Sequence, residues 1–184
     1  IKSKPEIEFV DGSKAIQKAR MIKTDWEISR IREVCKITEE AILETGKNIV
    51  AGKTTEKDVA KGIAKRMTEN GVDKISYLTV TSGIDKYCTF NTYATDRVIQ
   101  KGEYVLVDIS GHIDGYASDM TRVFYLGKAP EIERRMAQTA SDCVVVAKEA
   151  MRPGVPVSEI NRICEGVIKS SEFGDFVIHS SGHA

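Results

Sequence analysis

The sequence predicts an α+β fold, and three observations lead to this class. Segments 24–46 and 54–71 carry apolar residues at helical spacing and end at glycines. The stretch YVLVDISGHIDGYASDMTRVFYLG, residues 104–127, predicts two strands that join at GHIDG. A second pair of helices is predicted after Pro130. The 184 residues suit one domain, with room for a piece of another.

The first predicted helix begins after an unpatterned segment. Residues 1–20 show no sustained period and are interpreted as a strand and linker. Thr24 and Glu27 then have the spacing of a capping box, in which each side chain bonds to a backbone N–H at the start of a helix. Gly46 is the predicted stop of this helix.

The next elements complete the first half of the chain. A helix is predicted to start near Thr54 or Thr55, with an apolar face, and to end at the Asn-Gly pair 70–71. Its predicted apolar face consists of Val59, Ala60, Ile63, Ala64 and Met67. Residues 75–83 are predicted to form a strand before the hairpin.

The second half repeats this order weakly. A long helix is predicted from Pro130 to about Met151, a break at 153–156, and another helix from near Ser158. Residues 173–184 are predicted to form a strand. The order helix, turn, helix, strand thus occurs twice, which is compatible with an internal duplication or with chance.

Composition excludes several classes of function. Lys plus Arg and Asp plus Glu number 27 each, so no net field favours nucleic acid or an anionic membrane surface. No stretch approaches the roughly 20 apolar residues that span a bilayer, and no signal peptide is recognised. The cysteines are scattered without a CxxC pair, which favours reduced thiols in a cytoplasmic protein. They are Cys35, Cys88, Cys143 and Cys164.

Two aspartates stand inside the strand-like halves of the hairpin. With the turn centred on Ile113 and Asp114, Asp108 faces Asp119 across the strands. Like charges at such a spacing are destabilising, and a divalent cation would compensate them most directly. The alternative is that both acids lie in solvent or pair with Arg97 and Arg122.

Two histidines near the end of the chain favour the metal. His179 and His183 are two of the three histidines in the sequence, and a spacing of four in an extended segment places both on one face. Added to the aspartates, they make a metal site the better interpretation. His112 is interpreted as a surface residue of the turn.

The motif VDISGHIDGYASDMTR followed by HSSGHA resembles the pita-bread metallopeptidase family of methionine aminopeptidases, proline dipeptidases, aminopeptidases P and creatinases. The resemblance runs from about Arg20 to Ala184 and implies a curved antiparallel sheet with two helix pairs on one face and a pseudo-twofold repeat. Segment 19–42 is similar to the domain junction of the dipeptidase, aminopeptidase P and creatinase branch. We therefore expect residues 1–20 to end an N-terminal domain and 21–184 to form a catalytic domain that is incomplete at its C-terminus.

The same resemblance implies the site and its cofactors. It assigns metal binding to Asp108, Asp119 and His183, substrate contact to His179, and support of the bridging carboxylate, Asp119, to Thr121 and Arg122. The implied cofactors are two divalent ions, and a set of carboxylates with one imidazole suits Mn²⁺, Co²⁺ or Fe²⁺ at least as well as Zn²⁺.

Two departures from the family pattern affect the expected activity. Peptidase members carry a histidine where this chain has Phe90-Asn91, and we expect its absence to lower Xaa-Pro turnover. The family also uses two glutamates beyond the last motif, and the chain stops at Ala184 before either. We expect the chain by itself to be inactive.

The expected function is hydrolysis of a C–N bond by a dinuclear metal centre, as in an Xaa-Pro dipeptidase or aminopeptidase. The alternatives are a creatinase-like hydrolase of a small non-peptide molecule and a metal-free binding module of the same fold. The expected partners are a peptide or small-molecule substrate and a second copy of the chain in a homodimer, with no nucleic acid and no membrane.

Overall fold

The computed structural model describes residues 10–83, 92–177, 180 and 182. The chain divides into two compact units at Gly127 and Lys128, and each unit has its own internal packing.

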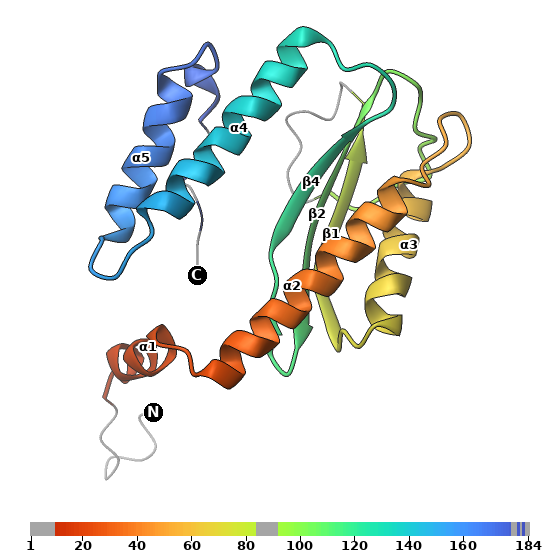
Figure 1. Ribbon diagram of the computed structural model, residues 1–184. Coiled ribbons are helices and arrows are strands. Elements are labelled where there is room, and N and C mark those ends of the chain that lie inside the picture. Colours follow the sequence, from red (N-terminus) through yellow and green to blue (C-terminus); the bar gives the residue numbers. More distant parts are fainter. Residues whose placement is uncertain (1–9, 84–91, 178–179, 181, 183–184) are drawn as a thin grey trace, which may run out of the picture. The chain divides into compact units, whose positions relative to one another are not determined.

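The first unit places two helices against an antiparallel sheet. Its elements are α1 Ser13–Met21, α2 Asp25–Gly46, α3 Glu56–Glu69, β1 Lys74–Ser82, β2 Tyr104–Ile113, β3 Tyr116–Ala117 and β4 Met120–Tyr125. β2 lies between β1 on one side and β3 and β4 on the other. α2 packs on β2 and α3 packs on β1, so both helices cover the same face of the sheet (Figure 1).

Helices α2 and α3 of this unit begin as the sequence predicts. Thr24 accepts a hydrogen bond from the backbone N–H of Glu27, and the Glu27 carboxylate accepts from the backbone N–H of Thr24. Thr55 and Asp58 form the same reciprocal pair at the start of α3. The two boxes satisfy N–H groups that would otherwise lack intrahelical partners, so the predictions at 24 and 55 are confirmed.

Alternation along β2 separates a core face from an open face. Val105, Val107 and Ile109 are fully buried and pack with Ile42 of α2 and Ile63 of α3. The residues between them on β2 turn to the other face, because successive strand side chains point to opposite sides. Each fully buried aliphatic side chain contributes roughly 1.5–3 kcal/mol to folding.

α2 approaches β4 closely at Gly46. A Cβ atom on Gly46 would lie 2.3 Å from ring carbons of Phe124 on β4. No side chain fits at that distance, so the glycine that ends the helix also allows the Phe124 ring to pack against the helix end.

The hairpin turn differs from the predicted one. Asp114 and Gly115 are its two central residues, with φ angles of 51° and 83°. Positive φ at both positions is the type I′ geometry, which matches strand twist and favours Asp-Gly. The predicted centre at Ile113 and Asp114 is therefore wrong by one position, and Asp108 pairs with Thr121 instead of Asp119.

Three further predictions about elements are corrected. Within the segment 1–20, residues 13–20 belong to helix α1, although residues 1–9 lie outside the described part. Gly174–Phe176 form a 3₁₀ turn and not the start of a strand. His112 is a half-buried strand residue of β2, paired with Ala117, and not a turn residue.

The second unit contains the predicted second helix pair, α4 Glu131–Ala150 and α5 Val157–Lys169, followed by η2 Gly174–Phe176. Cys143 and Cys164 are buried where the two helices face each other, and each thiol lies near the other residue's carbonyl oxygen, at 3.4 Å and 3.6 Å. Arg135 of α4 holds Glu172 at 2.6 Å. The two helices are therefore held together by the buried cysteines at their centre, and the ion pair of Arg135 ties the segment after α5 to α4.

The described cysteines Cys35, Cys143 and Cys164 are free thiols, as expected, and Cys88 lies outside the described residues. Within the described part of the chain, no helix combines the length and the apolar character needed to cross a bilayer.

Candidate metal centre

Asp108 and Asp119 meet at one hydroxyl group. The hydroxyl of Tyr77 lies 2.7 Å from Oδ1 of Asp119 and 3.3 Å from Oδ1 of Asp108, with hydrogen-bonding geometry to both. The two carboxylates therefore face one point, as the sequence predicts, although they are not direct cross-strand partners. Two carboxylates so placed repel each other unless donors or a cation compensate them.

The strand register explains how Tyr77 reaches both acids. Tyr77 pairs with Ser110 across β1 and β2, and Thr79 pairs with Asp108. The register of β2 with β3 and β4 is the same before and after Asp119. Asp119 therefore lies beside Ser110, on the side of β2 opposite to β1. The Tyr77 side chain thus passes over Ser110, and the small buried serine leaves room for it.

Thr121 provides a second donor to Asp108. It is the direct cross-strand partner of Asp108, and its Oγ1 donates a hydrogen bond of 2.8 Å to Asp108 Oδ1. Directly paired residues share a face of the sheet. Asp108 is half-buried, whereas Asp119 and Thr121 are exposed, so the carboxylates are open to a ligand from the face away from α2 and α3.

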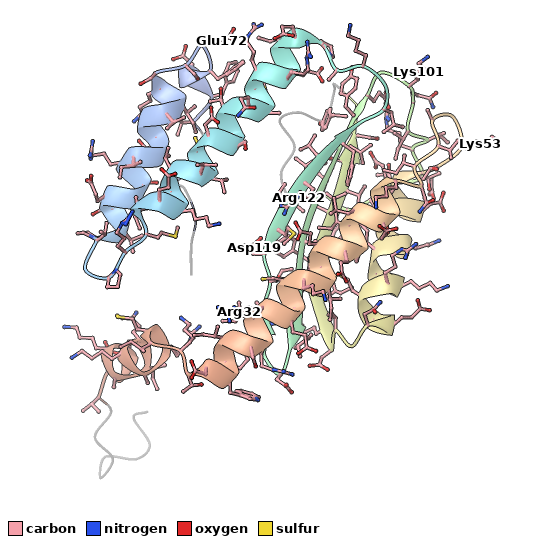
Figure 2. All side chains as sticks on the ribbon, in the orientation of Figure 1. Arg32, Lys53, Lys101, Asp119, Arg122 and Glu172 are labelled. Carbon is pink, nitrogen blue, oxygen red and sulfur yellow. The ribbon has the colours of Figure 1, made fainter. Side chains whose placement is uncertain are left out.

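Arg122 lies on the other face of the sheet. It pairs with the buried Val107, and its guanidinium donates to Glu39 of α2 at 3.0 Å and to the Thr121 carbonyl oxygen at 2.9 Å. Figure 2 labels Arg122 and Asp119 on the β4 side of the sheet. Arg122 therefore acts on the backbone of Thr121, whose side chain holds Asp108.

The two arginines of the alternative interpretation bond to other carboxylates. Arg122 holds Glu39, and Arg97 donates to Glu103 at 2.7 Å. Each guanidinium is thus engaged by another carboxylate.

The histidines predicted for the site, His179 and His183, lie outside the described residues, as does the Phe90-Asn91 pair. His112 bonds to the Ser76 hydroxyl through Nε2. Within the part of the chain that the structure describes, no group of three or more His, Cys, Asp or Glu side chains could hold a metal ion.

The described residues nevertheless fit a hard divalent cation. Such ions prefer carboxylate oxygens, and Asp108 and Asp119 lie close enough together for one hydroxyl group, that of Tyr77, to reach an oxygen of each. Tyr77 and Thr121 fix these oxygens by hydrogen bonds. Supporting contacts of this kind orient metal ligands.

Sequence reasoning missed Tyr77. Burial, followed by the hydrogen bond to Asp119 and the charge of Asp108, raises the pKa of Tyr77 above its ordinary value. The phenol therefore stays protonated and remains a donor throughout the neutral range. The available signal was its place in a predicted strand, but the register with β2 could not be read from the sequence.

Tyr77→Phe is expected to weaken metal binding or activity by about 10–100-fold, the usual effect of losing a group that supports metal ligands. Metal titration and steady-state kinetics of the full-length protein would measure it. Tyr116→Phe is the matched control, because it removes one tyrosine–carboxylate bond, to Glu27 at 2.7 Å, on another part of the unit. Equal losses in the two variants would contradict a role for Tyr77 at the aspartates.

Comparison with known proteins gives the family. Residues 29–184 match metallopeptidase family M24. An Xaa-Pro dipeptidase of Pyrococcus furiosus is 31% identical over 176 residues, which are 96% of this chain and 50% of that protein. An Xaa-Pro dipeptidase of Pyrococcus horikoshii is 28% identical over 184 residues, 100% of this chain and 52% of that protein. The chain thus spans about half the length of the curated relatives it matches.

Solved structures agree with this result. The prolidase of Pyrococcus horikoshii superposes with a TM-score of 0.89 at 27% identity, over 97% of this chain and 52% of that one. An Xaa-Pro dipeptidase from Bacillus anthracis has a TM-score of 0.86 at 25% identity, over 97% of this chain and 50% of that one. The fold is the pita-bread fold. Since the family match includes both aspartates and the strands that carry them, the chain belongs to metallopeptidase family M24.

Proposed function

We propose that the protein hydrolyses a C–N bond with two divalent metal ions, and that its substrates are Xaa-Pro peptides. The observation that carries the proposal is the convergence of Asp108 and Asp119 on the Tyr77 hydroxyl in a member of a metallopeptidase family. The names of the relatives, Xaa-Pro dipeptidases, support the substrate class.

In this proposal the residues of the chain have distinct roles in metal binding. Asp108 would bind one ion and Asp119 would bridge both, while Tyr77 and Thr121 keep the carboxylates in place. The bound ions would supply a water of lowered pKa and would polarise the scissile carbonyl group. Mn²⁺, Co²⁺, Fe²⁺ and Zn²⁺ are all candidates.

The open face of the sheet limits where the substrate can lie. Asp119 and Thr121 are exposed, whereas α2 and α3 cover the opposite face. The scissile bond must therefore approach from the open face. There Val123 of β4 is 58% exposed and supplies an apolar surface next to the aspartates.

The organisation of the whole protein is part of the proposal. Residues 1–20 would end an N-terminal domain and its linker, and residues 21–184 would belong to the catalytic domain. Helix α1 supports a linker role, because none of its residues is buried. A cytoplasmic homodimer is proposed, and the free thiols support a reducing compartment.

A creatinase-like activity on a small non-peptide substrate is the second candidate, favoured by the absence of histidine at Phe90-Asn91. The deciding experiment assays the full-length, Mn²⁺-reconstituted protein on Xaa-Pro dipeptides and on a panel of small amidines. Turnover of the dipeptides would support the proposal, and turnover of the small molecules alone would replace it. Less than about half an ion per chain after reconstitution, with neither activity, would indicate a metal-free binding module.

The two terminal histidines are predicted to have different roles. By resemblance, His183 binds metal and His179 contacts substrate, so His183→Ala should lower metal affinity while His179→Ala lowers kcat and leaves the metal content unchanged. Metal analysis beside steady-state kinetics distinguishes the two outcomes. Equal loss of metal in both variants would contradict the division of roles.

A further inference from the structure

A buried chain of hydroxyl groups connects helix α2 to the residue before Asp119. Ser118 is 1% exposed and Thr38 of α2 is 0% exposed, and their hydroxyl oxygens lie 2.8 Å apart. Thr38 Oγ1 lies 2.7 Å from the carbonyl oxygen of Val34. The backbone N–H of Gly111 on β2 donates to Ser118 Oγ at 3.1 Å.

The direction of these hydrogen bonds follows from counting protons. A hydroxyl has one proton to donate. The carbonyl of Val34 can only accept, so Thr38 donates to it and must accept from Ser118. Ser118 therefore donates to Thr38 and accepts from Gly111. The order Gly111, Ser118, Thr38, Val34 uses every proton once and satisfies each buried polar group, as buried groups require.

The chain of hydroxyls lies where the edge of the sheet is interrupted. β3 ends at Ala117 and β4 begins at Met120, so Ser118 and Asp119 connect the two strands without belonging to either. The Ser118 N–H donates to the Gly111 carbonyl oxygen at 2.8 Å, whereas the Gly111 N–H goes to the serine side chain. One of the two bonds at this position is thus made by a hydroxyl group that α2 holds in place.

This connection fixes the neighbouring aspartate. Side chains alternate between faces, so a Ser118 side chain held on the helix face keeps the Asp119 carboxylate on the open face. Gly111 is itself packed closely against the end of α3: a Cβ there would lie 2.4 Å from Met67 Cε and 3.1 Å from Val72 Cγ1.

We propose that Ser118 and Thr38 are positioning residues for the metal centre, which set the orientation of Asp119 from helix α2. This inference rests on the proposed function, since it assumes that Asp119 binds metal. Neither residue touches substrate or metal, and both act through the backbone that carries the aspartate.

The test compares Mn²⁺ affinity, by electron paramagnetic resonance titration of the full-length apoprotein, with kcat and KM at saturating Mn²⁺. Ser118→Ala removes the acceptor of Gly111 and the donor to Thr38, so Mn²⁺ affinity should fall about 10–100-fold, with lower kcat and unchanged KM. Thr38→Val should have a smaller effect, because Ser118 still accepts from Gly111 and can turn to the Gly111 carbonyl, at 3.4 Å. Thr38→Ser keeps the hydroxyl group and should retain the wild-type Mn²⁺ affinity and kcat.

A control variant separates a general loss of stability from a specific loss of metal affinity. Ile63→Val makes a small cavity in the same core, at a residue that is 0% exposed, and should change Mn²⁺ affinity less than twofold. Wild-type Mn²⁺ affinity in folded Ser118→Ala would overturn the positioning role alone. A full-length wild-type protein that binds none of Mn²⁺, Co²⁺, Fe²⁺ and Zn²⁺ would overturn the proposed function and the positioning role with it.

Discussion

Asp119→Asn is expected to abolish metal binding and activity together. The carboxylate faces Asp108 through the shared Tyr77 hydroxyl, and in the proposed centre it serves both ions. An amide of the same size keeps the shape but loses the charge and one of two equivalent oxygens. Losing several kcal/mol of charge stabilisation corresponds to a rate below about a thousandth of the wild-type value.

The measurement is metal content after dialysis against Mn²⁺, alongside turnover of an Xaa-Pro dipeptide by the full-length protein. Asp114→Asn is the matched control. It makes the same chemical change in the hairpin turn, where φ is 51° and Asn-Gly is as favourable as Asp-Gly. Near-wild-type turnover by Asp119→Asn in Mn²⁺ would show that the assignment of the ligand is wrong.

Local signals in the sequence predicted most of the first unit. The capping box at Thr24 and the helix start near Thr55 depend on residues within one helical turn, so a single sequence shows them. The position of the turn depends on which residues adopt positive φ. The Asp-Gly pair 114–115 gave that signal, and centring the turn one position earlier displaced the pairing by two residues.

The displacement left the predicted meeting of the aspartates intact for a physical reason. Strand side chains alternate with a period of two, so a two-residue error keeps every side chain on its face. Asp108 and Asp119 therefore still share the open face. The direct partner changed, which gave Asp108 the hydrogen bond from Thr121.

The groups that support the aspartates could not be predicted in the same way. Tyr77 reaches them from β1, which requires knowledge of the β1–β2 register. The bond between Thr38 and Ser118 joins residues 80 positions apart. Arg122 was assigned to the carboxylates by resemblance, but the face on which it lies follows from its pairing with Val107. These contacts are properties of the packed unit and have no local sequence pattern.

Glu56, a buried carboxylate at the start of α3, is the residue whose loss should most affect stability. It is 1% exposed. Its Oε1 accepts from the N–H and hydroxyl of Ser82 at 2.8 Å each, and its Oε2 accepts from the N–H and hydroxyl of Thr95 at 3.0 Å and 2.6 Å. A buried charge is tolerated when its oxygens are fully hydrogen-bonded in this way.

Glu56→Ala is therefore expected to destabilise the protein by about 3–5 kcal/mol, because it leaves the buried N–H of Ser82 and the part-buried N–H of Thr95 without their acceptor and creates a cavity. Urea unfolding followed by circular dichroism measures the change. Glu56→Gln should fall between wild type and Glu56→Ala, since its amide oxygen still accepts from one segment while its NH₂ group faces donors on the other. Glu44→Ala removes an exposed ion pair with Lys47 and should cost less than about 1 kcal/mol.

The loss of stability should also affect the site at the aspartates. Ser82 is the last residue of β1, the strand that carries Tyr77 and in which Thr79 pairs with Asp108. With its end released, β1 would fray toward the Tyr77 hydroxyl, and metal affinity should fall in parallel with stability across the Glu56 variants. A Glu56→Ala protein that unfolds at the wild-type urea concentration would mean that Ser82 and Thr95 find other acceptors. A Glu56→Ala protein that loses stability but keeps full metal affinity would show that the hydrogen bonds between β1 and β2 alone keep Tyr77 in position.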